Sequence, residues 1–174
     1  WVVGLKLQKL LEAKGFQVVM TKPEENQLVK NRERAQIANE AHAALMVRLH
    51  CDATNDSGFA LYYPDRQGIK EGVTGPSEQV IERSEQAARA IHVEMATTLK
   101  NVLKDGGIRG DSKTLIGSKQ GALTGSIFSQ VPVVTIEMIV LSNKSDAAFL
   151  KSENGQQSMA QAIAAGVEKF VFEK

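Results

Sequence analysis

Apolar positions along the chain follow two patterns, one typical of helices and one typical of buried strands. Four segments carry apolar side chains at helical spacing: 2–14, 26–42, 79–104 and 155–172. Four shorter apolar runs have the length of strands: 16–21, 44–51, 58–64 and 132–141. Gly15, Pro23 and the Gly106-Gly107 pair end three of these segments. The pattern also predicts a loop at 65–78 and a short strand at 114–117.

Helices and strands alternate along the chain, and this order predicts the fold class. The runs 16–21, 44–51 and 132–139 are almost continuously apolar, as expected for strands that are buried on both faces of a sheet. We therefore predict an α/β fold, in which helices cover both faces of a central, largely parallel twisted sheet. The 174 residues suffice for one core, so we expect residues 1–174 to form a single domain.

Composition and charge argue against several classes of partner. The chain has 21 basic and 20 acidic residues, so its net charge of +1 gives no electrostatic basis for binding nucleic acid or an anionic membrane. No apolar run approaches the ~20 residues of a membrane span. A single cysteine excludes an internal disulfide. Trp1 leads directly into helical periodicity, so we expect the chain to begin inside a domain.

Two polar side chains are candidates for chemistry within the predicted strands. His50 lies at the carboxyl end of its strand, the edge at which α/β sheets bind ligands. Glu137 lies inside an apolar strand, where burial of a lone carboxylate is unfavourable. His50 is either a metal ligand with Asp52 as a supporting neighbour, or a strand-end histidine that caps backbone groups. Glu137 is either a general base or a structural residue that pairs with an arginine or caps a helix end.

Several motifs recur in a fixed order over nearly the whole chain. The main ones are 5-LKLQKLLEAKGFQVVMTK-22, 34-RAQIANEAHAALMVRLHCDA-53, 132-PVVTIEMIVLSNKSDAAFLKS-152 and 160-AQAIAAGVEKF-170. Gly58 and Tyr62-Tyr63 fit the strand that follows the second motif. Together they resemble the Amidase_3 family of zinc-dependent N-acetylmuramoyl-L-alanine amidases. Two sites depart from the family pattern: Arg48 replaces a serine before the Ile-His pair, and the dipeptide Ile139-Val140 replaces Gly-Phe.

The resemblance implies a fold similar to that of zinc peptidases and a defined reaction. That reaction is hydrolysis of the amide bond between N-acetylmuramic acid and L-alanine in bacterial peptidoglycan. The resemblance implies that His50 is a zinc ligand and that Glu137 is the catalytic base and acid. The family's other two zinc ligands, a histidine and a glutamate, match no residue of this chain. We therefore expect them upstream of residue 1, with residues 1–174 as the rest of an amidase-like catalytic domain.

The resemblance also implies the surroundings in which the protein acts. It points to the stem peptide and glycan of peptidoglycan as substrate, to an activator protein as partner, and to a periplasmic, cell-wall or secreted location. The alternative is a catalytically inactive amidase-like domain that binds peptidoglycan fragments or a regulatory partner. A third interpretation, an unrelated flavodoxin-like domain that binds a small anion, has no Gly-rich strand-to-helix turn to support it.

Overall fold

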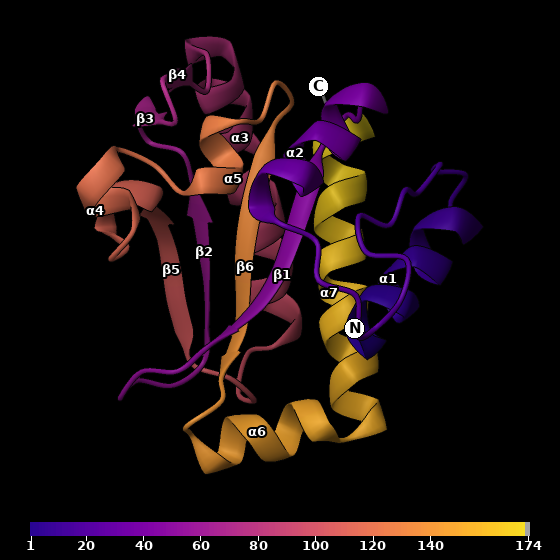
Figure 1. The fold of residues 1–174 in the computed structure, drawn as a ribbon. Helices are drawn as coiled ribbons and strands as arrows, with labels where there is room; N and C mark the ends of the chain where they lie inside the picture. Colours follow the sequence, from indigo (N-terminus) through magenta and orange to yellow (C-terminus); the bar gives the residue numbers. More distant parts are fainter. Residues whose placement is uncertain (173–174) are drawn as a thin grey trace.

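The computed structural model describes residues 1–172 and shows a central sheet with flanking helices (Figure 1). The longer helices are α1 (Val2–Ala13), α2 (Asn31–Glu40), α3 (Glu78–Thr98), α6 (Lys144–Lys151) and α7 (Glu153–Phe172). The strands are β1 (Met46–Asp52), β2 (Phe59–Tyr63), β3 (Gly68–Lys70), β4 (Val73–Gly75), β5 (Asp105–Gly110) and β6 (Val133–Val140). Three short helical turns lie between β5 and β6: η1 (Asp111–Lys113), α4 (Gly117–Gln120) and α5 (Thr124–Ile127).

The central sheet has the strand order β1-β6-β2-β5, and β3 pairs with β4 in a separate hairpin. The β1–β6 and β2–β5 pairs are parallel, whereas β2 and β6 are antiparallel. The reversal arises because residues 53–58, which join β1 to β2, are too few for the crossover that parallel strands need. The sheet is therefore mixed. The predicted α/β class, with helices on both sides of the sheet, is confirmed.

One face of the sheet carries the main core. Val134, Ile136 and Met138 alternate along β6 and point toward this core, as side chains two residues apart on a strand must. Helices α3 and α7 pack against each other on this face, and α1 packs against α7. Ile91 of α3 and Ile163 of α7 are fully buried there. Figure 1 shows α3 and α7 on the opposite side of the sheet from α2 and α5.

The other face carries a smaller core, which lies at one end only of the edge strand β1 and its neighbour β6. Met46 of β1 and Val133 of β6 pack against Ala38 of α2. Helices α2 and α5 contact each other and lie over this end of the sheet (Figure 1). His50 and Glu137 lie on the same face, four residues farther along the two strands. This cover thus leaves the side chain of His50 exposed to solvent.

Two predicted strands are wrong. Residues 16–21 join no sheet among the described residues, although Phe16 and Val18 pack against the main core. Residues 114–116 lie between η1 and α4, and Gly117 begins α4. The strand of that region is instead β5, whose glycines hid it in the sequence although its backbone pairs with β2. An apolar run becomes a strand only where a neighbouring backbone edge satisfies its hydrogen bonds.

Several element boundaries also differ from the prediction. The helix predicted at 26–42 begins at Asn31, where the side chain of Glu33 accepts a hydrogen bond from the backbone N–H of Lys30. The helix predicted at 79–104 ends at Thr98. The loop predicted at 65–78 contains the β3–β4 hairpin. Among the helices of residues 1–172, none is both long and apolar enough to cross a membrane.

Candidate functional site

The structure brings the two candidate side chains of the sequence analysis together. His50 and Glu137 are directly paired in the parallel β1–β6 ladder, so both side chains project from the same face of neighbouring strands. One residue pair earlier on this face, Arg48 lies beside Thr135. The register shifts immediately after His50. In a regular ladder Asp52 would pair with Ile139, but it pairs with Val140. A bulge therefore ends the regular ladder at His50, as bulges often do beside functional sites.

Glu137 has the environment of an acid–base group. Its side chain is half-buried, and its Oε2 atom is buried without a hydrogen-bond partner among residues 1–172. Burial and the negative charge of Asp52 raise the pKa of Glu137 to about 7, while the positive charge of Arg48 opposes this rise. A carboxyl group with this pKa exchanges protons readily near neutral pH. The structural alternative, a Glu137–arginine ion pair, is not formed among the described residues.

His50 is held in its neutral form, the form in which imidazole binds metals. Partial burial of the ring and the positive charges of Arg48 and Arg34 lower the pKa of His50 to about 4. The residue nevertheless remains exposed at the surface of the sheet. A neutral imidazole with an exposed edge is suited to donate a nitrogen to a metal ion.

The residues of the described chain do not complete a metal site by themselves. Nowhere in residues 1–172 do three or more His, Cys, Asp or Glu side chains converge so that they could hold a metal ion. Glu137 and Asp52 are the nearest carboxylates on the His50 side of the sheet. The buried, unbonded oxygen of Glu137 and the neutral ring of His50 are compatible with a metal centre. His50 and Glu137 account for only part of a metal centre.

Arg48 lies on the same face as His50 but points away from Glu137. Its Nη1 atom donates a hydrogen bond to the Thr135 hydroxyl (3.0 Å), and its Nη2 atom donates one to the Asn31 side chain of α2 (3.1 Å). The guanidinium packs against Gly125, where an added Cβ would lie 3.1 Å from Arg48 Cζ. The departure from the family pattern at this position thus joins β1 to α2 and α5.

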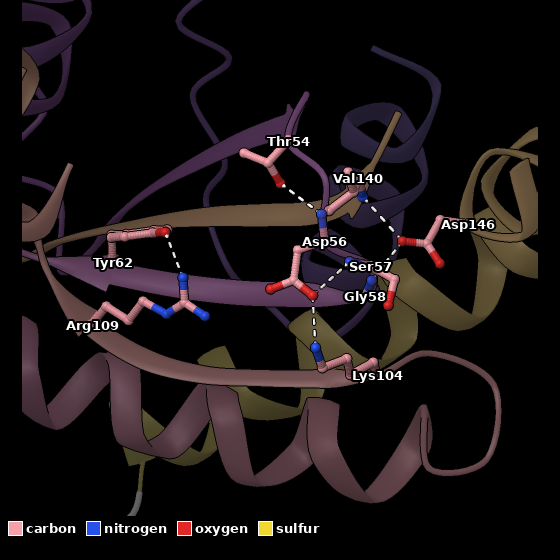
Figure 2. Close-up of polar contacts among 9 residues, drawn as sticks. All are labelled: Thr54, Asp56, Ser57, Gly58, Tyr62, Lys104, Arg109, Val140 and Asp146. Atoms are coloured by element: carbon pink, nitrogen blue, oxygen red, sulfur yellow. Dashed lines mark hydrogen bonds and ion pairs between the residues drawn. The ribbon is translucent and has the colours of Figure 1, made fainter. Parts of the chain in front are cut away.

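A buried aspartate fixes the loop that follows His50. The Asp146 carboxylate accepts hydrogen bonds from the backbone N–H of Gly58 (2.5 Å) and of Val140 (3.2 Å), as Figure 2 shows. Gly58 has a φ of 86°, and an added Cβ would lie 1.8 Å from the Lys104 carbonyl oxygen. Residues 53–58 are therefore tied both to the end of β6 and to the start of β5. The sequence analysis missed Asp146, which follows the N-cap Asn143 of α6 by three residues.

The face that carries Glu137 continues across β2 to β5. Ala60 is the direct partner of Glu137 on β2, and Tyr62 is the partner of Thr135. Arg109 of β5 pairs with Tyr62, and its Nη1 atom lies 3.4 Å from the Tyr62 hydroxyl (Figure 2). Sequence reasoning missed Arg109 because β5 was not recognised as a strand.

Two surface hollows lie away from His50 and Glu137. One is lined by residues of α2, β4 and the end of α5, among them Arg32, Gly75 and Phe128. Another surrounds the first turn of α2, from Leu28 to Arg34. Neither is lined by His50 or Glu137, so the chemistry of the site is not located by the shape of the surface alone.

Comparison with known proteins identifies a family. The model of the Amidase_3 family, described as N-acetylmuramoyl-L-alanine amidase, matches residues 1–169. N-acetylmuramoyl-L-alanine amidase Rv3717 of Mycobacterium tuberculosis is 28% identical over 176 residues, a match that covers 98% of this chain. The chain spans 66% of the length of that protein.

Solved structures show that the fold is shared. The crystal structure of the N-acetylmuramyl-L-alanine amidase Ami1 from Mycobacterium smegmatis matches with a TM-score of 0.81 at 24% identity, covering 100% of this chain and 76% of that one. The CwlD amidase from Clostridioides difficile, solved in complex with the GerS lipoprotein, matches with a TM-score of 0.73 at 21% identity. That match covers 98% of this chain and 83% of CwlD.

Proposed function

The chain belongs to the Amidase_3 family of N-acetylmuramoyl-L-alanine amidases, and from this premise we propose that it acts in hydrolysis of the amide bond between N-acetylmuramic acid and L-alanine in bacterial peptidoglycan. The observation that carries the proposal is the pairing of His50 with Glu137 on an exposed stretch of sheet. Acyl transfer to water needs a group that removes a proton from the water and returns it to the leaving nitrogen. Glu137 has the pKa and the position for this work.

Glu137 is proposed to be the catalytic base and acid. With a pKa of about 7, its carboxylate accepts a proton from the attacking water, and the resulting carboxylic acid donates that proton to the L-alanine nitrogen as the amide bond breaks. The free Oε2 atom supports this role, because no described group competes with water for it. The neighbouring Ala60 is small and leaves room for the substrate above the carboxylate.

Zinc dependence is the second part of the proposal, with His50 as one ligand. A zinc ion in such a site lowers the pKa of a bound water and polarises the amide carbonyl. His50 is neutral at physiological pH, as a ligand must be. Because a single histidine does not retain catalytic zinc, the proposal requires further ligands from outside residues 1–172.

The proposal includes a location and partners. Peptidoglycan lies outside the cytoplasm, so the protein would act in the periplasm, in the cell wall or after secretion, on the stem peptide and glycan. An activator protein is a further expectation, supported by the GerS complex of CwlD. Residues 1–174 would form the larger part of a single catalytic domain.

A catalytically inactive domain that binds peptidoglycan fragments is the alternative. It is favoured by one observation, the absence of a three-ligand metal cluster from residues 1–172. The full-length native protein, incubated with an N-acetylmuramoyl-L-alanyl peptide, distinguishes the two. Appearance of a new free L-alanine amino group supports the amidase. Binding of the peptide without its cleavage, in the presence of added zinc, would instead support the inactive domain.

A further inference from the structure

Small residues form the surface of the sheet that extends from Glu137 toward β5, which we call the floor. Ala60 is the partner of Glu137 on β2, and Gly106 of β5 lies against Ala60, since an added Cβ at Gly106 would be 3.2 Å from the Ala60 Cβ. Gly107 follows, and an added Cβ there would meet nothing within 4 Å. A substrate that reacts at Glu137 can therefore extend over β2 toward β5 without meeting a large side chain.

Larger side chains border this floor on two sides. On one side, the Lys104 ammonium and the Asp56 carboxylate form an ion pair of 2.6 Å at the beginning of β5. On the other, Tyr62 and Arg109 lie side by side, with the Arg109 Nη1 atom 3.4 Å from the Tyr62 hydroxyl. Figure 2 shows the two pairs toward opposite ends of β2 and β5.

The two basic groups at these borders differ in one respect. Lys104 is neutralised by Asp56, whereas exposed Arg109 forms no ion pair with any residue in 1–172. Among residues 1–172, the Tyr62 hydroxyl is the one side-chain group hydrogen-bonded to Arg109, and a tyrosine hydroxyl is itself a donor for an anion. A guanidinium presents paired donors whose geometry matches a carboxylate. Arg109 and Tyr62 therefore have the hydrogen-bond donors of a carboxylate-binding site, but no carboxylate of residues 1–172 forms an ion pair with Arg109.

The distance from Glu137 suits a group on the substrate peptide. Tyr62 stands diagonally opposite Glu137 on the adjacent strand, a relation that separates Cα atoms by about 7–8 Å. Arg109 is one strand farther. In a muramoyl-L-alanine substrate, the carboxyl group of the muramic acid is consumed in the amide bond to be cut. Free carboxylates therefore lie only on the peptide side of that bond.

We propose that Arg109, oriented by Tyr62, binds a stem-peptide carboxylate beyond the L-alanine residue, so that the peptide lies across β2 toward β5 and the glycan lies on the β1 side. The inference rests on the proposed function, because it takes Glu137 as the point of cleavage. Tyr62 is a positioning residue in this arrangement, and Arg109 determines specificity for an acidic peptide.

The test measures binding of two ligands to the full-length, metal-loaded protein carrying Glu137→Gln, which keeps the ligands intact. The ligands are N-acetylmuramoyl-L-alanyl-glutamate and the same compound with both carboxyl groups converted to carboxamides. Titration calorimetry gives the ratio of their dissociation constants. The variants Arg109→Gln and Tyr62→Phe are added singly, and Arg89→Gln is the matched control because Arg89 pairs with Glu85 on α3.

We expect the carboxylate ligand to bind about 10- to 100-fold more tightly than the carboxamide, and Arg109→Gln to abolish that ratio. Tyr62→Phe should reduce the ratio, and Arg89→Gln should leave it intact. Equal binding of the two ligands, a ratio that survives Arg109→Gln, or binding of neither would overturn the assignment. Hydrolysis of both compounds by the wild-type protein is measured in parallel. Cleavage of both compounds without a carboxylate preference would contradict the Arg109 subsite alone. Cleavage of neither compound would count against the proposed function.

Discussion

Glu137 is half-buried, and one of its carboxylate oxygens is buried and unbonded among the described residues. Its pKa of about 7 arises from burial and from Asp52, both of which disfavour the charged form. His50 shows the opposite shift for the same reason, since burial and nearby arginines disfavour its charged form as well. The sequence pattern predicted that both residues lie on strands. It could not predict the shifts in their pKa values, because Asp52, Arg48 and Arg34 act on the two residues through space.

The pKa of Glu137 predicts how stability depends on pH in the metal-free protein. Between the ordinary value of 4.5 and the folded value of about 7, the folded state binds more protons than the unfolded state. Glu137 therefore makes the free energy of unfolding fall as pH rises through this window. Glutamine cannot ionise, so Glu137→Gln should gain about 1–2 kcal/mol relative to wild type between about pH 5 and pH 8, after allowance for solvent screening.

Urea unfolding of both proteins in the presence of a chelator checks this. Glu153→Gln, at the exposed start of α7, is the control and should show the same pH dependence as wild type. A constant stability difference between wild type and Glu137→Gln across the window would show that burial does not perturb this carboxyl group.

At the scale of elements, hydrophobic periodicity identified the long helices and the strands β1, β2 and β6, because these bury apolar faces. It failed at residues 16–21, which are apolar but pair with no described strand. It failed again at β5, which has few apolar side chains and is held by backbone pairing with β2. Strand partners are a tertiary property, so the antiparallel β2–β6 pair and the nearness of Arg109 to the site were not predictable from local pattern.

The loop between β1 and β2 depends on Asp146, and this gives a prediction at the same scale. Asp146→Ala removes the acceptor for two backbone N–H groups, those of Gly58 and Val140, and leaves both donors buried. We expect the free energy of unfolding to fall by about 2–4 kcal/mol. Asp56→Ala removes only an exposed ion pair with Lys104 and should cause a much smaller change.

Chemical denaturation of wild type, Asp146→Ala and Asp56→Ala measures the difference. Figure 2 shows Asp56 in the loop and Asp146 beside it. Equal losses for Asp146→Ala and Asp56→Ala would mean that the buried hydrogen bonds do not hold the loop. Hydrogen exchange at the Gly58 and Val140 amides gives an independent readout, since both should exchange faster only in Asp146→Ala.

At the scale of the whole molecule, one face of the sheet is devoted to the core and the other carries the site. Helices α1, α3 and α7 pack on the first face, while α2 and α5 cover one end of the second. The remaining floor holds His50, Glu137 and Arg109 on three different strands. The family match supports a peptidoglycan amidase, and in the proposed reaction Glu137 is the acid–base group and His50 is one metal ligand.

In the proposed reaction, Glu137 performs the chemistry and His50 holds the metal. The most direct test measures zinc content and hydrolysis rate on the same samples of the full-length protein. Glu137→Gln should keep about one zinc per chain while its rate falls by about 10²- to 10⁴-fold. His50→Ala should lose both zinc and activity, and His42→Ala, at an exposed position after α2, should lose neither. Full zinc content and full rate in His50→Ala, or a near-normal rate in Glu137→Gln, would contradict the account.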